Sequence, residues 1–196
     1  MTTLLACSLL ASAIPSFADD TLPLASYTSS PPPPLIESVP GIYQITVGDP
    51  TGDASYWSEV VRVLNKAGPT DTILFRLHSP GGDVGGLTYV MNALQTTKAN
   101  TIADIDGPSS SAAAMLACSA KYLILEPNSY LMYHAGSLTL EGTEKSSDLA
   151  SFLKAHDRSF KILMQPCVDK HILTEKQVDN AIKGIDIYVF PADIGQ

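Results

Sequence analysis

Three consecutive serines, Ser109 to Ser111, stand in the stretch GPSSSAAAMLACSA at residues 107–120. A serine in the first turn of a helix is well placed to attack a carbonyl carbon, because the helix N-terminus favours the negative charge that develops. Serine is also a common helix cap, so an isolated run of three is more simply explained as the polar start of a buried helix. The chemical interpretation therefore depends on which residues accompany the serines.

Two further segments carry residue types that suit attack on a carbonyl. The sequence HSPGGD at residues 78–83 follows a short apolar run, and His134 follows another. Two adjacent glycines let the backbone turn sharply and leave amide N–H groups uncovered, and Asp83 is well placed to cap a helix. A plain strand-to-helix turn is the alternative. The segment has neither a GxGxxG pattern nor a GK[ST] ending, so a phosphate-binding loop is not predicted.

Apolar residues recur with the periods of strands and helices in alternation. Strands are predicted near 42–47, 72–77, 101–105, 122–125, 130–133 and 187–189, and helices near 57–64, 87–94, after the serines, at about 144–164 and at 175–183. This order implies βαβ units and a mainly parallel sheet, so the predicted fold class is α/β. The glycine turn and the serines both follow strand ends, where ligand crevices form in parallel sheets.

The composition limits the possible functions. The chain has 196 residues, 45% of them hydrophobic and 16% charged, which is typical of one globular domain. A formal charge of −8 argues against binding to nucleic acids or anionic membranes, which require a basic surface. No metal-binding or cofactor-binding motif is found, so neither a metal nor a cofactor is predicted.

The N-terminal region differs from the rest of the chain. Residues 1–18 combine an apolar stretch with small residues before Asp19 and are predicted to be a signal peptide, although their start lacks Lys and Arg. Residues 19–40, with four consecutive prolines, are interpreted as a spacer, and the domain as 41–196. Export to the periplasm or secretion is therefore expected. A cytoplasmic protein with a buried N-terminal segment is the alternative.

Two of the three cysteines, Cys118 and Cys167, lie beyond the predicted signal peptide. Their spacing fits no zinc or redox motif. The sequence favours two small buried thiols, and it leaves open whether they pair in an oxidising compartment.

Three segments together resemble the proteolytic subunit of the Clp protease (ClpP) and the wider ClpP/crotonase superfamily. They are TILFRLHSPGGDVGG, GPSSSAAAMLACSAKYLILEPNSYLMYHAGS and, more weakly, GIDIYVFPADIG. The resemblance covers roughly residues 41–196. It implies a ClpP/crotonase-like fold of repeated ββα and βαβ units with a handle-like long helix. It also implies a serine endopeptidase that cleaves peptide bonds through a Ser-His-Asp triad.

Aligning the run from Pro108 to His134 with the family's motif assigns a role to each candidate residue. It places the family's nucleophile at Ser110, its general base at His134 and its third triad member at Asp186. The backbone N–H groups of Gly82 and Ser111 are then expected to form the oxyanion hole.

Two alternatives accompany this assignment. The related SppA-like peptidases use a lysine base, and Lys161 is the candidate in this chain, while Asp179 competes with Asp186 for the third position. A catalytically inactive binding or assembly module on the same fold is the other alternative. Two residues depart from the family pattern, because Ala112 stands where glycine is usual and His78 replaces a polar residue before SPGG.

The resemblance also suggests partners. A peptide or unfolded protein is the expected substrate, and the long helix is a reason to expect a homo-oligomer. An ATP-driven unfoldase is not expected, because exported proteins meet no ATP. No nucleic-acid partner is expected.

Overall fold

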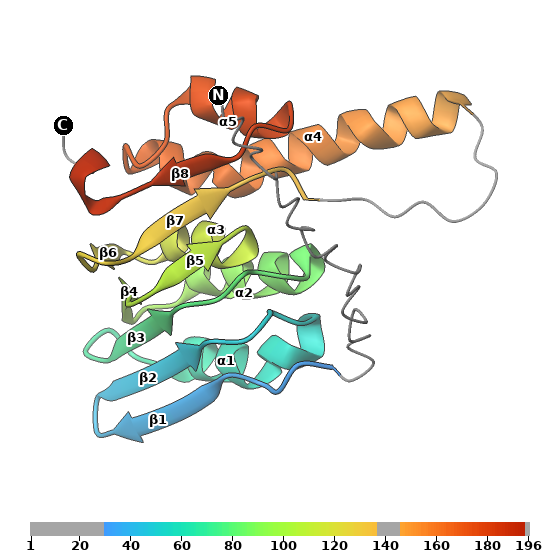
Figure 1. The fold of residues 1–196 in the computed structure, drawn as a ribbon. Helices are drawn as coiled ribbons and strands as arrows, with labels where there is room; N and C mark the ends of the chain where they lie inside the picture. The colour runs from blue at the N-terminus through green and yellow to red at the C-terminus, as the bar shows by residue number, and fades with distance from the viewer. Residues whose placement is uncertain (1–29, 137–145, 195–196) are drawn as a thin grey trace, which may run out of the picture.

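The computed structural model describes residues 30–136 and 146–194, and it arranges them in alternating strands and helices (Figure 1). The predicted signal peptide and the first half of the predicted spacer lie outside the described residues. The elements in chain order are β1 (Leu35–Val39), β2 (Ile42–Val47), α1 (Ala54–Lys66), β3 (Thr72–Leu77), α2 (Val84–Thr96), β4 (Asn100–Ile105), β5 (Pro108–Ser110), α3 (Ala112–Ser119), β6 (Tyr122–Leu125), β7 (Tyr130–Tyr133), α4 (Ser146–Asp169), α5 (Glu175–Ile182), β8 (Ile187–Val189) and the 3₁₀ turn η1 (Pro191–Asp193).

The strands form two sheets. A five-stranded sheet has the order β1-β2-β3-β4-β6, in which every neighbouring pair except β1-β2 is parallel. A three-stranded sheet has the order β5-β7-β8, with β5 parallel and β8 antiparallel to β7. The predicted α/β class with a mainly parallel sheet is confirmed.

Side-chain alternation explains how the helices cover the five-stranded sheet. In β3, Ile73, Phe75 and Leu77 are buried while the residues between them are partly exposed. The helices α1, α2 and α3 lie on one side of the strands (Figure 1). Buried side chains of α1 recur at helical spacing and contribute Trp57 and Leu64 to the core, where each fully buried large apolar side chain contributes roughly 2 kcal/mol.

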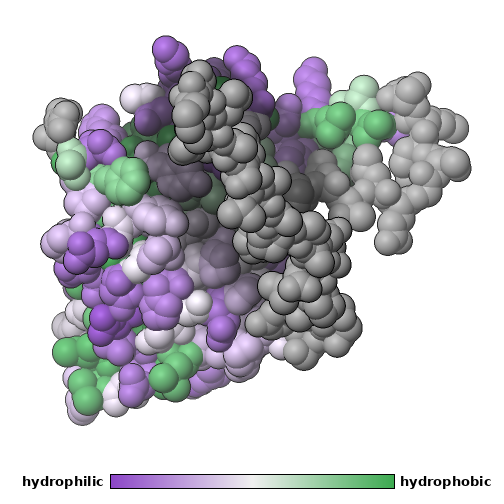
Figure 2. All heavy atoms as spheres, viewed as in Figure 1, coloured by the Kyte–Doolittle hydropathy of each residue, from purple (hydrophilic) through white to green (hydrophobic). Residues whose placement is uncertain are grey.

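Among the described residues, no helix lies on the other face of this sheet, which is partly exposed (Figure 1). Figure 2 shows it as largely polar, with apolar side chains gathered over the β1-β2 hairpin. The exposed apolar residues of that hairpin are Leu35, Val39 and Ile42.

The described part of the predicted spacer, residues 30–40, contains one strand. Leu35–Val39 form β1, which pairs antiparallel with β2 through a turn at Pro40 and Gly41. Gly41 has a φ of 79°, a conformation that glycine adopts at no steric cost. The Pro-Gly turn therefore joins two paired strands, the first of which lies in the segment that the sequence interprets as a spacer.

The helix α4 is longer than the predicted 144–164, because it continues through Pro166 to Asp169. Its C-terminal half packs into the core through Phe160, Met164 and Cys167. Its N-terminal half projects beyond both sheets (Figure 1). Among the helices of the described residues, none has the length and apolar character needed to cross a membrane.

Candidate active site

The register of the three-stranded sheet brings three of the predicted site residues to one edge. Tyr133 of β7 pairs with Ile187 of the antiparallel strand β8, so the next opposing positions are His134 and Asp186. Ser110 is the last residue of β5, whose carboxyl end lies beside the carboxyl end of β7 because the two strands are parallel. The backbone therefore gathers the serines, His134 and Asp186 although 76 positions separate the first from the last.

Ser110, His134 and Asp186 also lie on one face of the sheet, because every second residue of a strand faces the same side. Ser110 pairs with Met132, which in turn pairs with Tyr188, and all three are at least partly exposed. His134 is half-buried and Asp186 is exposed. Within the described part of the chain, no hydrogen bond joins these side chains to one another. Such contacts are often loose in ligand-free sites and tighten when substrate binds.

The junction between β5 and α3 has an unusual backbone. Ser111 has φ 54° and ψ −122°, and its N–H donates to the carbonyl of Met132 at 2.8 Å. A non-glycine residue in such a conformation costs roughly 1–3 kcal/mol and persists only where the surroundings enforce it. A strained strand-to-helix turn of this kind presents the nucleophilic serine in the α/β-hydrolases. The backbone thus singles out Ser111, the residue after the expected nucleophile Ser110.

The glycine turn lies directly against this junction. Gly81 has a φ of 90°, and a Cβ added there would lie 2.5 Å from the Ser110 carbonyl oxygen and 2.8 Å from the Ala112 nitrogen. The Ser110 N–H donates to the Ser79 carbonyl at 2.9 Å. Only glycine allows so close an approach, so the turn and the serine junction form one compact unit.

Of the two N–H groups expected to form the oxyanion hole, those of Gly82 and Ser111, the second is not available. The Ser111 N–H, expected to face the oxyanion, is already bonded to Met132. In the described residues, the N–H groups of Gly82 and of Ala112, the first residue of α3, have no acceptor. The first N–H groups of a helix lack partners within the helix, so Ala112 has a free donor beside the glycine turn.

The loop after β2 supports the glycine turn from the other side. The Thr51 N–H donates to the Gly81 carbonyl at 2.8 Å, and the Asp83 N–H donates to the Thr51 carbonyl at 2.9 Å. Ser79 Oγ donates to the Asp49 carbonyl at 2.7 Å. Asp83 caps α2 as predicted, accepting from the Gly86 N–H at 2.6 Å. These bonds fix the turn without using the Gly82 N–H.

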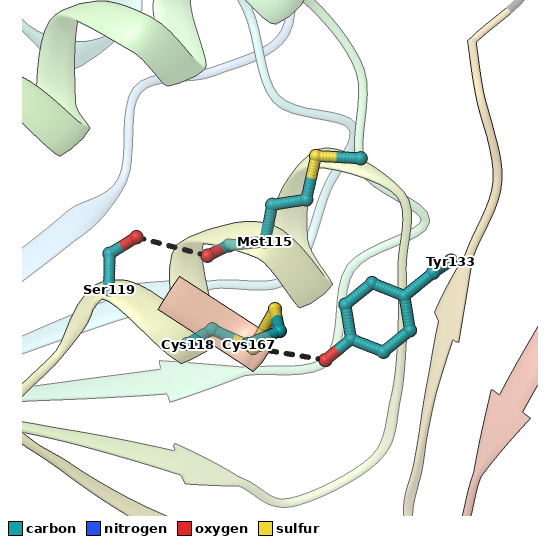
Figure 3. Close-up of a disulfide and its surroundings, with 5 residues drawn as sticks. All are labelled: Met115, Cys118, Ser119, Tyr133 and Cys167. Carbon is teal, nitrogen blue, oxygen red and sulfur yellow. Dashed lines mark hydrogen bonds between the residues drawn. A yellow bond between two sulfur atoms is a disulfide. The ribbon is translucent and has the colours of Figure 1, made fainter. Parts of the chain in front are cut away.

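A disulfide joins the helix that begins at the serine junction to α4 (Figure 3). Cys118 and Cys167 are both fully buried, and their Cα atoms are 5.0 Å apart. The hydroxyl of Tyr133, the residue before His134, lies 3.1 Å from Cys118 Sγ. The sequence favours two free thiols, but the packing of α3 on α4 places them at facing positions and they pair.

Lys161, the candidate base of the SppA-like alternative, contacts Asp179, the competitor of Asp186 for the third triad position. Lys161 Nζ lies 2.6 Å from Asp179 Oδ1, and both side chains are about half exposed. The hydrogen bond and charge of Asp179 raise the pKa of Lys161, while Lys161 lowers the pKa of Asp179. A lysine with a raised pKa is a poorer base, so this pair does not favour the SppA-like alternative.

Among the described residues, no group of three or more His, Cys, Asp or Glu side chains is placed to hold a metal ion. The unusual backbone of Ser111 is the feature that sequence reasoning misses. Spacing does not distinguish which of three adjacent serines ends the strand and which turns into the helix.

These observations define a class of protein: a mainly parallel α/β fold that presents a serine beside a di-glycine turn. The chain matches the Clp protease family over residues 43–183, which is most of its length, and the protein therefore belongs to that family. The matched range contains the glycine turn, the serines and His134, and it ends before Asp186. A comparison with individual curated proteins found no match.

Proposed function

We propose that this Clp protease family member is a serine peptidase that hydrolyses peptide bonds in peptides or unfolded proteins. The observation that carries the proposal is the strained backbone of Ser111 beside Gly81, at the edge where His134 and Asp186 oppose each other. In this proposal, a serine attacks the peptide carbonyl, His134 accepts its proton, and Asp186 orients His134 and offsets the charge of the imidazolium.

The proposed reaction accounts for each proton transferred and for each bond formed or broken. The serine Oγ adds to the carbonyl carbon while His134 takes the hydroxyl proton, and the N–H groups of Gly82 and Ala112 bind the oxyanion. His134 then gives the proton to the leaving amine, and the C–N bond breaks. A water molecule repeats the sequence on the acyl-enzyme, which releases the acid and restores the serine.

We infer that Ser111 is the nucleophile and that Ser110, the nucleophile expected from the sequence, is its neighbour. Ser111 occupies the strained turn directly before the free Ala112 N–H. Ser110 lies within β5, in the row of Met132 and Tyr188. With Ser111 as the attacking residue, the following N–H completes the oxyanion hole, as it does at other strained serine turns.

Labelling with a fluorophosphonate probe tests the activity and separates the two serines. Ser111→Ala and His134→Ala are expected to abolish labelling and hydrolysis of an unfolded protein, whereas Ser110→Ala retains both. Ser109→Ala is the matched control, because Ser109 is fully buried. Loss of labelling in Ser110→Ala alone assigns the role to Ser110. A folded wild type that labels no better than the Ser111→Ala, Ser110→Ala and His134→Ala variants refutes the peptidase and favours a binding module.

We also propose a homo-oligomer assembled through the projecting half of α4. Phe152 and Leu153 lie on that half and are 48% and 43% exposed. Burying such side chains on association is favourable. Phe152→Lys with Leu153→Lys is expected to lower the mass measured by sedimentation, whereas Ile162→Lys, exposed nearer the sheets, is not. An unchanged mass for the double variant, or a monomeric wild type, contradicts this proposal.

Export is the third part of the proposal. The buried Cys118–Cys167 disulfide supports it, because disulfides persist mainly in oxidising compartments. N-terminal sequencing of the protein from separated cell fractions is expected to show a chain that begins after residue 18 and resists thiol alkylation. A chain that begins at Met1 and is alkylated at both Cys118 and Cys167 contradicts export.

A further inference from the structure

A polar cluster stands on the uncovered face of the five-stranded sheet, where β3 and β4 end. His78 Nδ1 lies 2.9 Å from Asp106 Oδ1, and Arg76 Nη2 lies 2.7 Å from Asp106 Oδ2. The carboxylate thus receives a different partner on each oxygen. Figure 2 shows the largely polar face on which the cluster lies.

The register of the strands explains the position of this cluster. Leu77 pairs with Val47 on one side and Ile105 on the other, so the next row contains Gly48, His78 and Asp106. A Cβ added at Gly48 would lie 2.4 Å from His78 Nε2. The imidazole therefore spans two strand ends, with Nδ1 toward Asp106 and Nε2 against the Gly48 backbone.

The two partners connect the segments that build the candidate site. His78 directly precedes Ser79, whose carbonyl accepts the Ser110 N–H, and the Gly81–Gly82 turn follows. Asp106 directly precedes Gly107, which leads into β5. A Cβ added at Gly107 would lie 2.9 Å from the His78 Cβ, so His78 and the start of the serine segment are in close contact.

Two hydrogen-bond partners keep the Asp106 carboxylate ionised and fix its orientation. Partial burial alone would raise the pKa of Asp106, but hydrogen bonds from His78 and Arg76 outweigh it and lower the pKa below its ordinary value. Asp106 is therefore a carboxylate at neutral pH. Because Arg76 holds one oxygen, the other is directed at His78 and the carboxylate has little freedom to rotate.

We propose that His78 and Asp106 are positioning residues, whose hydrogen bond holds the glycine turn in register with the serine segment. The inference rests on the proposed peptidase function. Neither side chain touches substrate in this role. Their effect reaches the reaction through the Gly82 N–H and the serine turn, so their loss is expected to lower kcat and leave KM nearly unchanged.

Two substitutions at one position separate positioning from other roles. His78→Leu removes the hydrogen bond to Asp106, while His78→Asn keeps an amide N–H near the place of Nδ1. For hydrolysis of a fluorogenic peptide, we expect kcat of His78→Leu to fall by about 10- to 100-fold with KM within about twofold. His78→Asn is expected to recover most of that loss. Asp106→Asn provides a second variant if His78→Leu does not fold.

Hydrogen exchange supplies a measurement that is independent of activity. The Ser110 amide, bonded to Ser79, is expected to exchange faster in His78→Leu, while the Phe75 amide inside β3 does not. Wild-type kcat in His78→Leu, or unchanged exchange at Ser110, overturns the inference. Equal impairment in His78→Asn and His78→Leu also overturns it, because the imidazole itself would then be required. If the wild type lacks peptidase activity but Ser110 exchange responds as expected, the proposed function fails and the structural connection stands.

Discussion

The close approach of the glycine turn to the serine junction makes Gly81→Ala a sharp test of the site. The new Cβ would lie 2.5 Å from the Ser110 carbonyl oxygen, whereas ordinary contacts begin at 3.4 Å. The turn and the serine segment must therefore move apart by roughly 0.9 Å, the difference between these distances. A displacement of about 1 Å at a catalytic site typically costs about 100-fold in rate, so kcat is expected to fall by that factor.

Gly41→Ala is the matched control for this substitution. Gly41 has a similar φ of 79°, but its nearest neighbour would lie 3.9 Å from an added Cβ, in the turn between β1 and β2. Both variants are expected to lose roughly 1–2 kcal/mol of unfolding free energy because alanine disfavours a positive φ, and Gly81→Ala loses more because its Cβ also clashes with Ser110. Only Gly81→Ala is expected to lose activity.

The assay is steady-state hydrolysis of a fluorogenic peptide by both variants, with urea unfolding in parallel. If both variants are folded and share the wild-type kcat, the proposed contact between the turn and the serine junction has no catalytic role. Equal losses of kcat in the two variants also refute the reasoning, because general destabilisation would then explain the effect.

Three further predictions concern stability. Replacing Cys118 and Cys167 by alanine is expected to lower the unfolding free energy by about 4 kcal/mol for their separation of 49 residues, measured by urea denaturation; an unchanged midpoint contradicts it. Because the pKa of Asp106 is lowered in the folded state, its contribution is present above pH of about 4 and is lost on acidification. Asp106→Asn should therefore flatten the acid limb of a stability–pH profile, and a parallel profile contradicts this. Burial raises the pKa of Tyr133 in the folded state. Above pH of about 10 the unfolded chain loses the Tyr133 proton while the folded chain keeps it, so the wild type loses stability as the pH rises. Tyr133→Phe has no such proton and should therefore lose less stability there.

Much of the fold follows from periodic patterns in the sequence. The two-residue period of β3 and the helical period of α1 predict their positions, because one face of each is buried. The pattern does not reveal β1, in which Leu35 and Val39 are 61% exposed, so no buried face marks it as a strand. Nor does it reveal β5, which is only three residues long.

The candidate site could be predicted less completely. The positions of His134 and Asp186 follow from motifs near strand ends, and the register then sets them opposite each other. The choice between Ser110 and Ser111 depends on one pair of backbone angles, which spacing does not encode. The Cys118–Cys167 bond depends on how α3 meets α4 across 49 positions, which is a property of packing and not of local sequence.

The late position of β8 in the chain has a consequence for the protein during its synthesis. This strand, which pairs with β7 and follows Asp186, comes from the last residues that the structure describes. During synthesis, the serines and His134 emerge well before Asp186, so a partly synthesised chain lacks the third member of the proposed triad. Under the proposed function, we therefore expect no peptidase activity until β8 has been made and has paired with β7.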